Sequence, residues 1–383
     1  MESSRFANGL DALWDIPLSK RQITTPTEIQ RLVIPRVLAD ENVLFRSATG
    51  TGKTYAYLLP VLQNIYVSPE RDMPKAIVVA PTLELASQIQ KEAEYLIYET
   101  NINIHAALLI GGANKERQAA ALKKIRPELI IGNTARIIEL VRERRLKLHH
   151  IRYLILDEAD NFTANEQIEM CKTLLSMLPY SRVTLACSAT LHAQSEQLLE
   201  SITGARFIRV ETDAHEVIRD YIEHWALWHE GKNKAPAVRE LIAAAGIKRA
   251  LVFAKNSDEV KKVCAELQTH NISARALYSG QKKSERALAL KDFREKKCRV
   301  LSASDLAARG LDISGISYVI SLGAEQNPDI YINRAGRTGR SGRHGICVSI
   351  GNESELRRLR KIEQKLRITV YPKILSGGRL LVP

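Results

Sequence analysis

A glycine-rich segment, residues 47–54, contains the first residues whose types and spacing could do chemistry. It reads S-A-T-G-T-G-K-T, with an apolar run before it and a helix-like stretch after it. Gly50 and Gly52 would let the backbone curl so that successive N–H groups point at anionic oxygens. We expect Lys53 to reach the β- and γ-phosphates of a nucleotide and the Thr54 hydroxyl to ligate Mg²⁺. The segment therefore predicts a phosphate-binding loop.

An acidic pair, Asp157 and Glu158, follows the apolar run 151–156, about 100 residues beyond this loop. In isolation such a pair is typical of a solvated turn. After a buried strand in a protein with a phosphate loop, the first acid holds Mg²⁺, directly or through water. The second acid can orient and deprotonate the attacking water. The pair therefore indicates nucleotide hydrolysis.

Three arginines, Arg334, Arg337 and Arg340, are spaced three residues apart. On a helix this spacing puts them on one face, where guanidinium groups could bind phosphate oxygens and offset charge in a transition state. Gly336 and Gly339 weaken a helix here, so a solvated basic turn is an equal alternative.

Alternating strands and helices would position these groups. In the first half of the chain, apolar strands are expected at residues 76–80, 104–110, 129–131, 151–156 and 183–187. Continuous apolar strands that alternate with helices indicate a parallel sheet covered on both faces. The polar motifs follow the carboxyl ends of these strands, where open α/β sheets bind ligands. The predicted fold class is therefore α/β.

The pattern resets in a linker expected at about residues 211–216, and a second strand–helix series follows. Its strands are expected at residues 249–254, 274–277, 299–303, 318–321 and 346–350, with basic helices at 283–297 and 353–366. Only the first half contains a phosphate loop. We therefore expect one ATP site in the first domain, completed from the second.

The composition favours a nucleic-acid partner. The 383-residue chain has a net charge of +13; residues 1–213 carry 25 Lys and Arg against 25 Asp and Glu, whereas residues 214–383 carry 31 against 18. This one-sided excess favours a polyanion, nucleic acid before membrane. The five scattered cysteines indicate neither a zinc site nor a disulfide framework. The N-terminus has no signal-peptide pattern and no apolar run is long enough for a membrane span, so a cytoplasmic protein without membrane contact is expected.

Taken in order, the motifs resemble those of the DEAD-box RNA helicases over about residues 6–345. The matching segments are P-T-E-I-Q at 26–30, the loop at 47–54, D-E-A-D at 157–160, S-A-T at 188–190 and R-G-L-D at 309–312. The resemblance implies a superfamily 2 helicase core of two RecA-like parallel-sheet domains in tandem, at residues 1–212 and 213–383. A flexible linker would join them, and ATP and RNA would bind across the cleft.

The resemblance also implies residue roles toward ATP and Mg²⁺. Gln30 would read the adenine edge, with Phe6 packed on the base, and Thr27 would brace the phosphate loop. The loop residues that hold the nucleotide would be Gly50, Thr51, Gly52, Lys53 and Thr54.

The remaining ATP-side roles fall on both domains. The metal would be held by Thr54 and Asp157, and the water by Glu158. From the second domain, Gly310 and Asp312 would reach the nucleotide, and Arg337 and Arg340 would be the arginine fingers. The implied catalytic residues are thus Lys53, Asp157, Glu158, Arg337 and Arg340.

RNA would lie across small and polar residues of both domains. The implied RNA-binding residues are Pro81, Thr82, Gly111, Gly112, Thr134, Arg136, Asn256, Arg286 and Ser304. Such contacts go mostly to phosphate and 2′-hydroxyl groups, which gives a preference for RNA without much sequence readout. The residues implied to couple the two domains are Asp160, Ser188, Thr190, Asn333 and Arg334.

Several positions depart from the family pattern, mostly on the RNA side. Leu83 stands where the family usually has arginine, and the T-P-G-R motif begins with Asn133 and keeps only its arginine. Lys283 replaces a glutamine and Asn333 a histidine. Ser47 replaces the first glycine of the phosphate loop, a place where the family tolerates alanine. The hydrolysis residues are intact.

The sequence therefore predicts an RNA-dependent ATPase that locally separates short RNA duplexes or remodels RNA–protein complexes. The changes at Leu83, Asn133 and Asn333 favour an alternative, an ATP-gated RNA clamp or assembly scaffold with weak unwinding. A DNA translocase is a third interpretation, against which Gln30 and the D-E-A-D spelling count. The chain resembles a bare helicase core, so we expect a monomer whose specificity comes from a protein partner or from its basic C-terminal helix.

Overall fold

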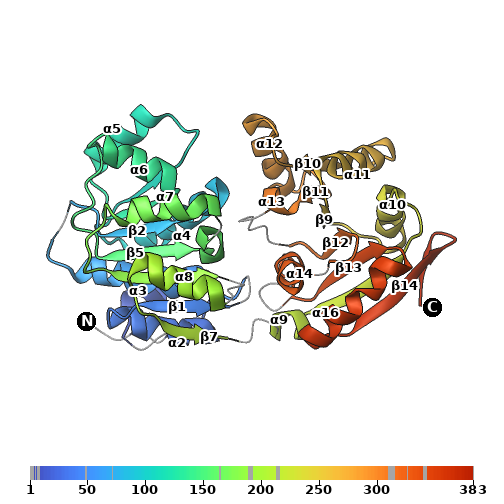
Figure 1. Cartoon of the computed structure of the whole chain (residues 1–383), viewed down its shortest axis with the longest axis horizontal. Helices are drawn as coiled ribbons and strands as arrows, with labels where there is room; N and C mark the ends of the chain where they lie inside the picture. Colours follow the sequence, from blue (N-terminus) through green and yellow to red (C-terminus); the bar gives the residue numbers. More distant parts are fainter. Residues whose placement is uncertain are drawn as a thin grey trace. The chain divides into compact units, whose positions relative to one another are not determined.

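The computed structural model of the chain describes residues 4, 6, 9–47, 50–70, 72–163, 165–188, 193–212, 216–308, 315–325, 327–339 and 343–382. The chain forms two compact units. Unit 1 contains Met1–Ser47 and Thr51–Asp213, and unit 2 contains Ala214–Pro383. Each unit is an α/β structure in which helices cover a central sheet (Figure 1).

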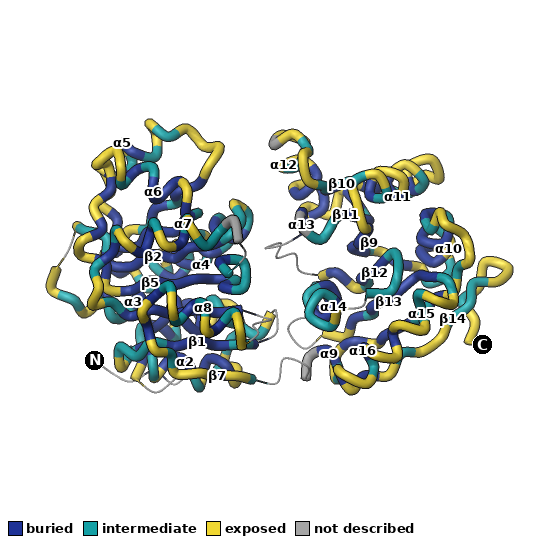
Figure 2. The backbone as a smooth tube through the Cα atoms, in the orientation of Figure 1, coloured by how far each residue is buried: buried dark blue, intermediate teal, exposed yellow. Residues whose placement is uncertain are grey.

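Unit 1 is built on a parallel sheet with the strand order β3-β4-β2-β5-β6-β1-β7 in the described part of the chain. The strands are β1 (Val43–Arg46), β2 (Ala76–Val79), β3 (Ala106–Leu109), β4 (Leu129–Gly132), β5 (Tyr153–Asp157), β6 (Val183–Ser188) and β7 (Ile208–Glu211). The neighbouring strands pair in parallel, so the residues that follow them gather at one edge. Both faces of most strands are buried, which explains the continuous apolar runs (Figure 2).

Helices pack against both faces of this sheet. They are η1 (Ala12–Trp14), α1 (Asp15–Lys20), α2 (Glu28–Leu38), α3 (Lys53–Val67), α4 (Leu83–Thr100), α5 (Lys115–Ile125), α6 (Thr134–Arg142), η2 (Ala159–Thr163), α7 (Asn165–Leu175) and α8 (Ala193–Thr203). Alternate strand residues point to opposite faces. In β1, Val43 and Phe45 pack with α2, α3 and α4, whereas Leu44 belongs to the core with α6, α7 and α8.

Unit 2 repeats the design with a sheet of order β10-β11-β9-β12-β13-β8-β14-β15 among the described residues. The strands are β8 (Ile222–Trp228), β9 (Ala250–Ala254), β10 (Ala274–Leu277), β11 (Val300–Ser304), β12 (Tyr318–Leu322), β13 (Gly345–Gly351), β14 (Val370–Ser376) and β15 (Arg379–Leu381). The helices are α9 (Glu216–Asp220), α10 (Ala235–Ala244), α11 (Ser257–Thr269), α12 (Lys283–Arg294), α13 (Asp305–Ala308), α14 (Pro328–Ala335), α15 (Glu353–Arg357) and α16 (Leu359–Leu366). Only the β14–β15 pair at the edge is antiparallel among the described strands.

The predicted fold class is confirmed, and the differences lie in single elements. Residues 353–366 form two helices, α15 and α16, because the chain tightens at Arg358, whose N–H bonds to the Glu355 carbonyl three residues back. Strand β8 was not expected, because its sequence I-E-H-W-A-L-W interrupts the apolar run with Glu223 and His224. The hairpin of β14 and β15 was not expected either.

The part of the chain that the structure describes holds no helix of the length and apolar character needed to cross a membrane.

Candidate functional site

The predicted phosphate loop connects the end of β1 with the start of α3. Gly50 and Gly52 have φ values of 84° and 90°, in the left-handed region that glycine enters without strain. The Lys53 ammonium donates to the Ser47 carbonyl oxygen at 2.7 Å. Residues 48 and 49 lie outside the described residues. The local geometry supplies the tight turn and the helix start that a phosphate loop requires.

Ser47 is part of the internal bonding of this loop. Its hydroxyl is buried, lies 2.7 Å from the Thr51 hydroxyl and accepts from the Thr212 hydroxyl at 2.8 Å. Ser47, which departs from the strict glycine pattern, therefore bonds both to Thr51 within the loop and to Thr212, the residue after β7.

The P-T-E-I-Q segment lies directly against the phosphate loop. Thr27 and Gln30 form a capping box at the start of α2, in which the Thr27 N–H donates to Gln30 Oε1 at 2.9 Å. The other end of the amide, Gln30 Nε2, donates to the Gly52 carbonyl at 3.1 Å. A Cβ atom at Gly52 would lie 2.3 Å from Gln30 Nε2. Gln30 thus joins α2 to the loop, and Gly52 must be a glycine for this approach.

Phe6 is buried in the core that contains α2 and α3, with only 4% of its surface exposed. Its backbone N–H donates to the Ser4 hydroxyl at 2.9 Å. Stacking of this ring on an adenine base stays a prediction.

The D-E-A-D segment starts on the last residue of β5. Asp157 is buried, and its carboxylate accepts from the Tyr57 hydroxyl at 2.8 Å, the Cys187 thiol at 3.0 Å and the Glu158 N–H at 2.9 Å. Glu158 has a φ of 51°, so the chain turns sharply after the strand. Asp160 accepts from the Ser188 hydroxyl at 2.5 Å, which brings the D-E-A-D and S-A-T segments together. Thr190 lies outside the described residues.

Tyr57 and Cys187 were not singled out from the sequence, although both contact the predicted metal ligand. Burial, with the charge of Asp157, raises the pKa of both groups well above their ordinary values. Both therefore stay protonated and act as donors. The sequence did contain a clue, because Tyr57 follows Thr54 by three residues on a helix and Cys187 directly precedes Ser188.

The predicted RNA residues of unit 1 follow β2, β3 and β4. Thr82 caps α4, its hydroxyl accepting from the Leu85 N–H at 3.2 Å, and Leu83 beside it is 39% exposed. Gly111 and Gly112 follow β3, with a φ of 83° at Gly112. Pro81 lies between β2 and α4, and Thr134 is buried at the start of α6.

Asn133, the first residue of the altered T-P-G-R motif, has a structural role at the start of α6. It caps α6, and its side-chain oxygen accepts from the Arg136 N–H at 3.2 Å. Asparagine is among the best residues for this position. The change therefore preserves the helix start that presents Thr134 and Arg136.

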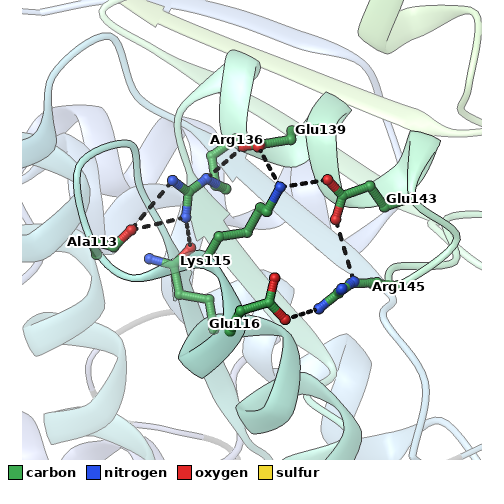
Figure 3. A network of polar contacts seen from close by, with 8 residues as sticks. Ala113, Lys115, Glu116, Arg136, Glu139, Glu143 and Arg145 are labelled. Atoms are coloured by element: carbon green, nitrogen blue, oxygen red, sulfur yellow. Dashed lines mark hydrogen bonds and ion pairs between the residues drawn. The ribbon is translucent and has the colours of Figure 1, made fainter.

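Arg136 is engaged within unit 1 (Figure 3). Its guanidinium donates to the Ala113 carbonyl at 3.3 Å and to Gln118 Oε1 at 2.9 Å, and it pairs with Glu139 at 2.9 Å. Its side chain is 9% exposed. The arginine thus ties the Gly111–Gly112 turn to α6, and a phosphate contact by the same group stays a prediction.

The same network continues over the surface (Figure 3). Lys115 pairs with Glu139 at 3.0 Å and with Glu143 at 2.6 Å, and Arg145 pairs with Glu116 and Glu143. These pairs offset the charge of several cations that could otherwise face RNA.

Of the three predicted RNA residues of unit 2, two form hydrogen bonds within the unit and one has no hydrogen-bond partner among the described residues. Asn256 caps α11 through the Glu259 N–H at 2.9 Å, and Arg286 donates to the Ala307 carbonyl at 3.0 Å. The Ser304 hydroxyl ends β11 and has no hydrogen-bond partner among the described residues. The Ser304 oxygen is buried, so a contact with RNA stays a prediction.

Of the two alternatives for the three arginines, a shared helix face and a basic turn, the structure favours the turn at Arg337. Helix α14 ends at Ala335 with Gly336 as its cap, so Arg334 is helical and Arg337 is not. Glycine costs about 1 kcal/mol in a helix interior, which favours the stop. Arg337 donates to the Asn333 carbonyl at 3.3 Å. Arg340, Gly310 and Asp312 lie outside the described residues.

Arg334 forms ion pairs that stabilise unit 2. It is buried and makes a bidentate pair with Asp305 at 2.7 and 2.6 Å, and a further pair with Glu325 at 3.4 Å. This geometry fixes α14 against the segment that follows β11. The predicted coupling residue is thus bonded within its own unit.

The comparisons with known proteins all lead to the same family. The DEAD/DEAH box helicase model matches residues 27–198, and the helicase conserved C-terminal domain model matches residues 233–342. The chain is 33% identical over 356 residues to the probable ATP-dependent RNA helicase YfmL of Bacillus subtilis, covering 93% of this chain and 92% of that protein. It is 35% identical to the DEAD-box ATP-dependent RNA helicase CshC of Bacillus cereus, covering 92% and 88%.

The structure is also similar to that of S. cerevisiae Dbp5 bound to RNA and ADP BeF3. The TM-score is 0.84 with 26% sequence identity, and the match covers 95% of this chain and 94% of that one.

Proposed function

This chain belongs to the DEAD-box ATP-dependent RNA helicases, and we propose that it is an RNA-dependent ATPase that separates short RNA duplexes or remodels RNA–protein complexes. The observation that carries the proposal is the meeting of four segments in unit 1. Gln30 bonds to the phosphate loop at Gly52, and Asp160 of D-E-A-D bonds to Ser188 of S-A-T. Residues 1–212 and 213–383 are the two functional domains.

Hydrolysis of ATP uses groups that the fold of unit 1 holds in place. Lys53 and the N–H groups of the loop bind the phosphates, and Glu158 holds the attacking water after the turn at the end of β5. Arg337 and Arg340 supply positive charge from unit 2, which offsets charge developing on the transferred group. Gly310 and Asp312 of unit 2 also contact the nucleotide. The Asp160–Ser188 bond links the hydrolysis segment to the S-A-T segment, whose state depends on bound RNA.

Magnesium fits the donor set of this site. In proteins that act on nucleotides, Mg²⁺ is held by one or two side-chain oxygens and by the substrate phosphates, with waters completing its shell. The Thr54 hydroxyl and the Asp157 carboxylate are oxygen ligands of this kind. Among the described residues no group of three or more His, Cys, Asp or Glu could hold a metal. When bound, the ion neutralises phosphate charge.

RNA is bound mainly through its backbone. The proposed contacts are those of Pro81, Thr82, Gly111, Gly112, Thr134, Asn256, Arg286 and Ser304, with Arg136 behind the glycine turn. The net charge of residues 214–383 supports this assignment, because phosphate contacts by Lys and Arg dominate affinity for nucleic acids.

ATP turnover with and without single-stranded RNA tests the proposal. We expect RNA to stimulate turnover severalfold, and Glu158→Gln to abolish turnover while nucleotide binding persists, because the carboxylate acts on the water and not on the nucleotide. Turnover that is absent, or unchanged by RNA, contradicts the proposal. Equal stimulation by single-stranded DNA points to a DNA translocase.

A second candidate, an ATP-gated RNA clamp with weak unwinding, is favoured by two observations. The guanidinium of Arg136 is engaged inside unit 1, and Leu83 presents an apolar surface where the family usually has arginine. Fewer cations on the RNA side would leave less binding energy for strand separation. Displacement of a short RNA duplex decides between them: robust ATP-dependent displacement excludes the clamp.

The chain acts as a monomer in the cytoplasm, and a protein partner supplies specificity. The five cysteines, all of which lie in described residues, are free and buried, which suits a reducing compartment.

A further inference from the structure

The hydroxyl of Tyr57 bonds to Asp157, one of the two side chains proposed to hold magnesium. Tyr57 is on α3, three residues after Thr54, and is completely buried. Its hydroxyl donates to Asp157 Oδ2 at 2.8 Å. The phenol proton is therefore used on one of the proposed metal ligands.

The remaining bonds of Asp157 restrict where a metal or its water can approach. Oδ1 accepts from the Glu158 N–H at 2.9 Å and from the Cys187 thiol at 3.0 Å. Oδ2 accepts from Tyr57. A carboxylate offers about four lone-pair directions, two on each oxygen. The direction left over is on Oδ2, the oxygen that Tyr57 holds.

We propose that Tyr57 is a positioning residue of the magnesium site, which aligns the Asp157 carboxylate before the metal binds. The inference rests on the proposed ATPase function. The Tyr57 hydroxyl holds Oδ2, and the Glu158 N–H and the Cys187 thiol hold Oδ1, so the carboxylate is fixed in one orientation. Preorganised ligands bind more tightly than ligands that must be ordered.

Two tyrosines of α3 provide a matched pair of variants. Tyr57→Phe removes only the oxygen that bonds to Asp157. Tyr55→Phe removes an oxygen from a neighbouring buried tyrosine, whose hydroxyl bonds to Glu92 at 2.7 Å and accepts from Arg21 at 2.5 Å. Both variants keep the aromatic ring and therefore most of the packing.

The test measures metal binding, in the full-length protein, separately from turnover. The magnesium concentration that half-saturates binding of a fluorescent ADP is determined, and Mn²⁺ binding is followed by electron paramagnetic resonance. We expect Tyr57→Phe to raise the half-saturating concentration about 10-fold, the effect of losing one hydrogen bond to a charged group. Tyr55→Phe should stay within about 2-fold of wild type, and nucleotide binding in EDTA should be the same in all three proteins.

Several outcomes overturn the proposal. Equal magnesium dependence of the two variants does so, as does a loss of nucleotide binding by Tyr57→Phe in EDTA, which would indicate general damage. If Tyr57→Phe does not fold, Cys187→Ala carries the test, because the thiol fixes the other carboxylate oxygen. We expect it to raise the half-saturating concentration about 3-fold, since thiols are weak donors, and an unchanged value contradicts the proposal.

The wild-type titration separates this proposal from the proposed function. If the wild-type chain binds no nucleotide with magnesium, the ATPase function itself fails. If the wild type binds and the two tyrosine variants do not differ, only the role of Tyr57 fails.

Discussion

Replacing Arg136 by methionine shows whether this arginine serves the fold or the RNA. Its guanidinium holds the Ala113 carbonyl, Gln118 and Glu139 in the network of Figure 3. Methionine keeps the apolar stem and removes every donor. If the structural task dominates, the turn after β3 should loosen while the electrostatics of RNA binding stay the same.

The expected loss of local stability follows from the hydrogen bonds of Arg136 and from the solvent exposure of the side chains that make them. Hydrogen bonds to a charged group contribute roughly 1.5–3 kcal/mol each. The Arg136 side chain is 9% exposed, but that of Glu139 is 41% exposed and regains water when the arginine is lost. The contributions therefore do not add in full. We expect the free energy of local opening of residues 106–142 to fall by about 2–3 kcal/mol.

Hydrogen exchange of the full chain measures this local opening. Arg145→Met is the matched control: Arg145 belongs to the same network, but its side chain is 38% exposed and its pairs with Glu116 and Glu143 lie at the surface. Exposed pairs contribute less than about 1 kcal/mol, so exchange should change little.

RNA binding at a series of salt concentrations gives the second readout. A lost phosphate contact lowers the slope of log affinity against log salt by about 0.7 for single strands. We expect an unchanged slope for Arg136→Met. Unchanged hydrogen exchange together with a slope lowered by about 0.7 would refute the structural role and assign Arg136 to the RNA.

Two further predictions concern the phosphate loop and a buried histidine. Gly52→Ala places a Cβ 2.3 Å from Gln30 Nε2 at a φ of 90°, so we expect ATP binding to weaken by about 2 kcal/mol, roughly 30-fold. Gly204→Ala is the control: its φ is also positive, but its Cβ would meet only Tyr180 at an ordinary contact distance of 4.0 Å, so the affinity for a fluorescent ATP analogue should stay unchanged. Burial lowers the pKa of His224 from 6.5 to about 4, so unfolded chains bind its proton first as the pH falls. The stability of unit 2 should be fully present above pH 6.5 and decline toward pH 4, by on the order of 3 kcal/mol from this group. Urea unfolding at several pH values checks this, and a His224→Gln variant with an equally steep pH dependence would contradict it.

The sequence predicted best those elements whose pattern of apolar and polar residues matches their burial in the fold. The apolar runs before Ala80, Gly132 and Asp157 form buried strands because both faces of a parallel sheet are covered, so no polar residue interrupts them. Strand β8 escaped prediction because His224 is polar by type yet is satisfied in the core, with Nε2 bonded to the Ile218 carbonyl and Nδ1 to the Tyr331 hydroxyl. Tyr331 comes from a distant part of the chain, and the Ile218 partner is a main-chain carbonyl, so neither leaves a pattern in the sequence.

In the candidate site, too, contacts between distant residues could not be predicted from the sequence. The order of the motifs identifies Lys53 and Asp157, but not the side chains that hydrogen-bond to them. Tyr57 and Cys187 occupy positions that read as core residues of a helix and a strand, and their contact with Asp157 arises because α3 and β6 both pack beside β5. The arginines near Gly336 show the converse: a regular spacing suggested a helix face, and one glycine ended the helix.

The distribution of charge indicates which unit supplies most of the electrostatic affinity for RNA. Residues 1–213 carry no net charge, and in unit 1 the cations Lys115, Arg136 and Arg145 are paired with carboxylates. The whole surplus of +13 lies in residues 214–383. At physiological salt the Debye length is about 8 Å, so this surplus acts on phosphates that lie against unit 2 and little on those farther away. We infer that unit 2 provides the salt-dependent part of RNA affinity. In that case the salt slope of the wild type is set by cations beyond residue 213, and neither Arg136→Met nor Arg145→Met lowers it.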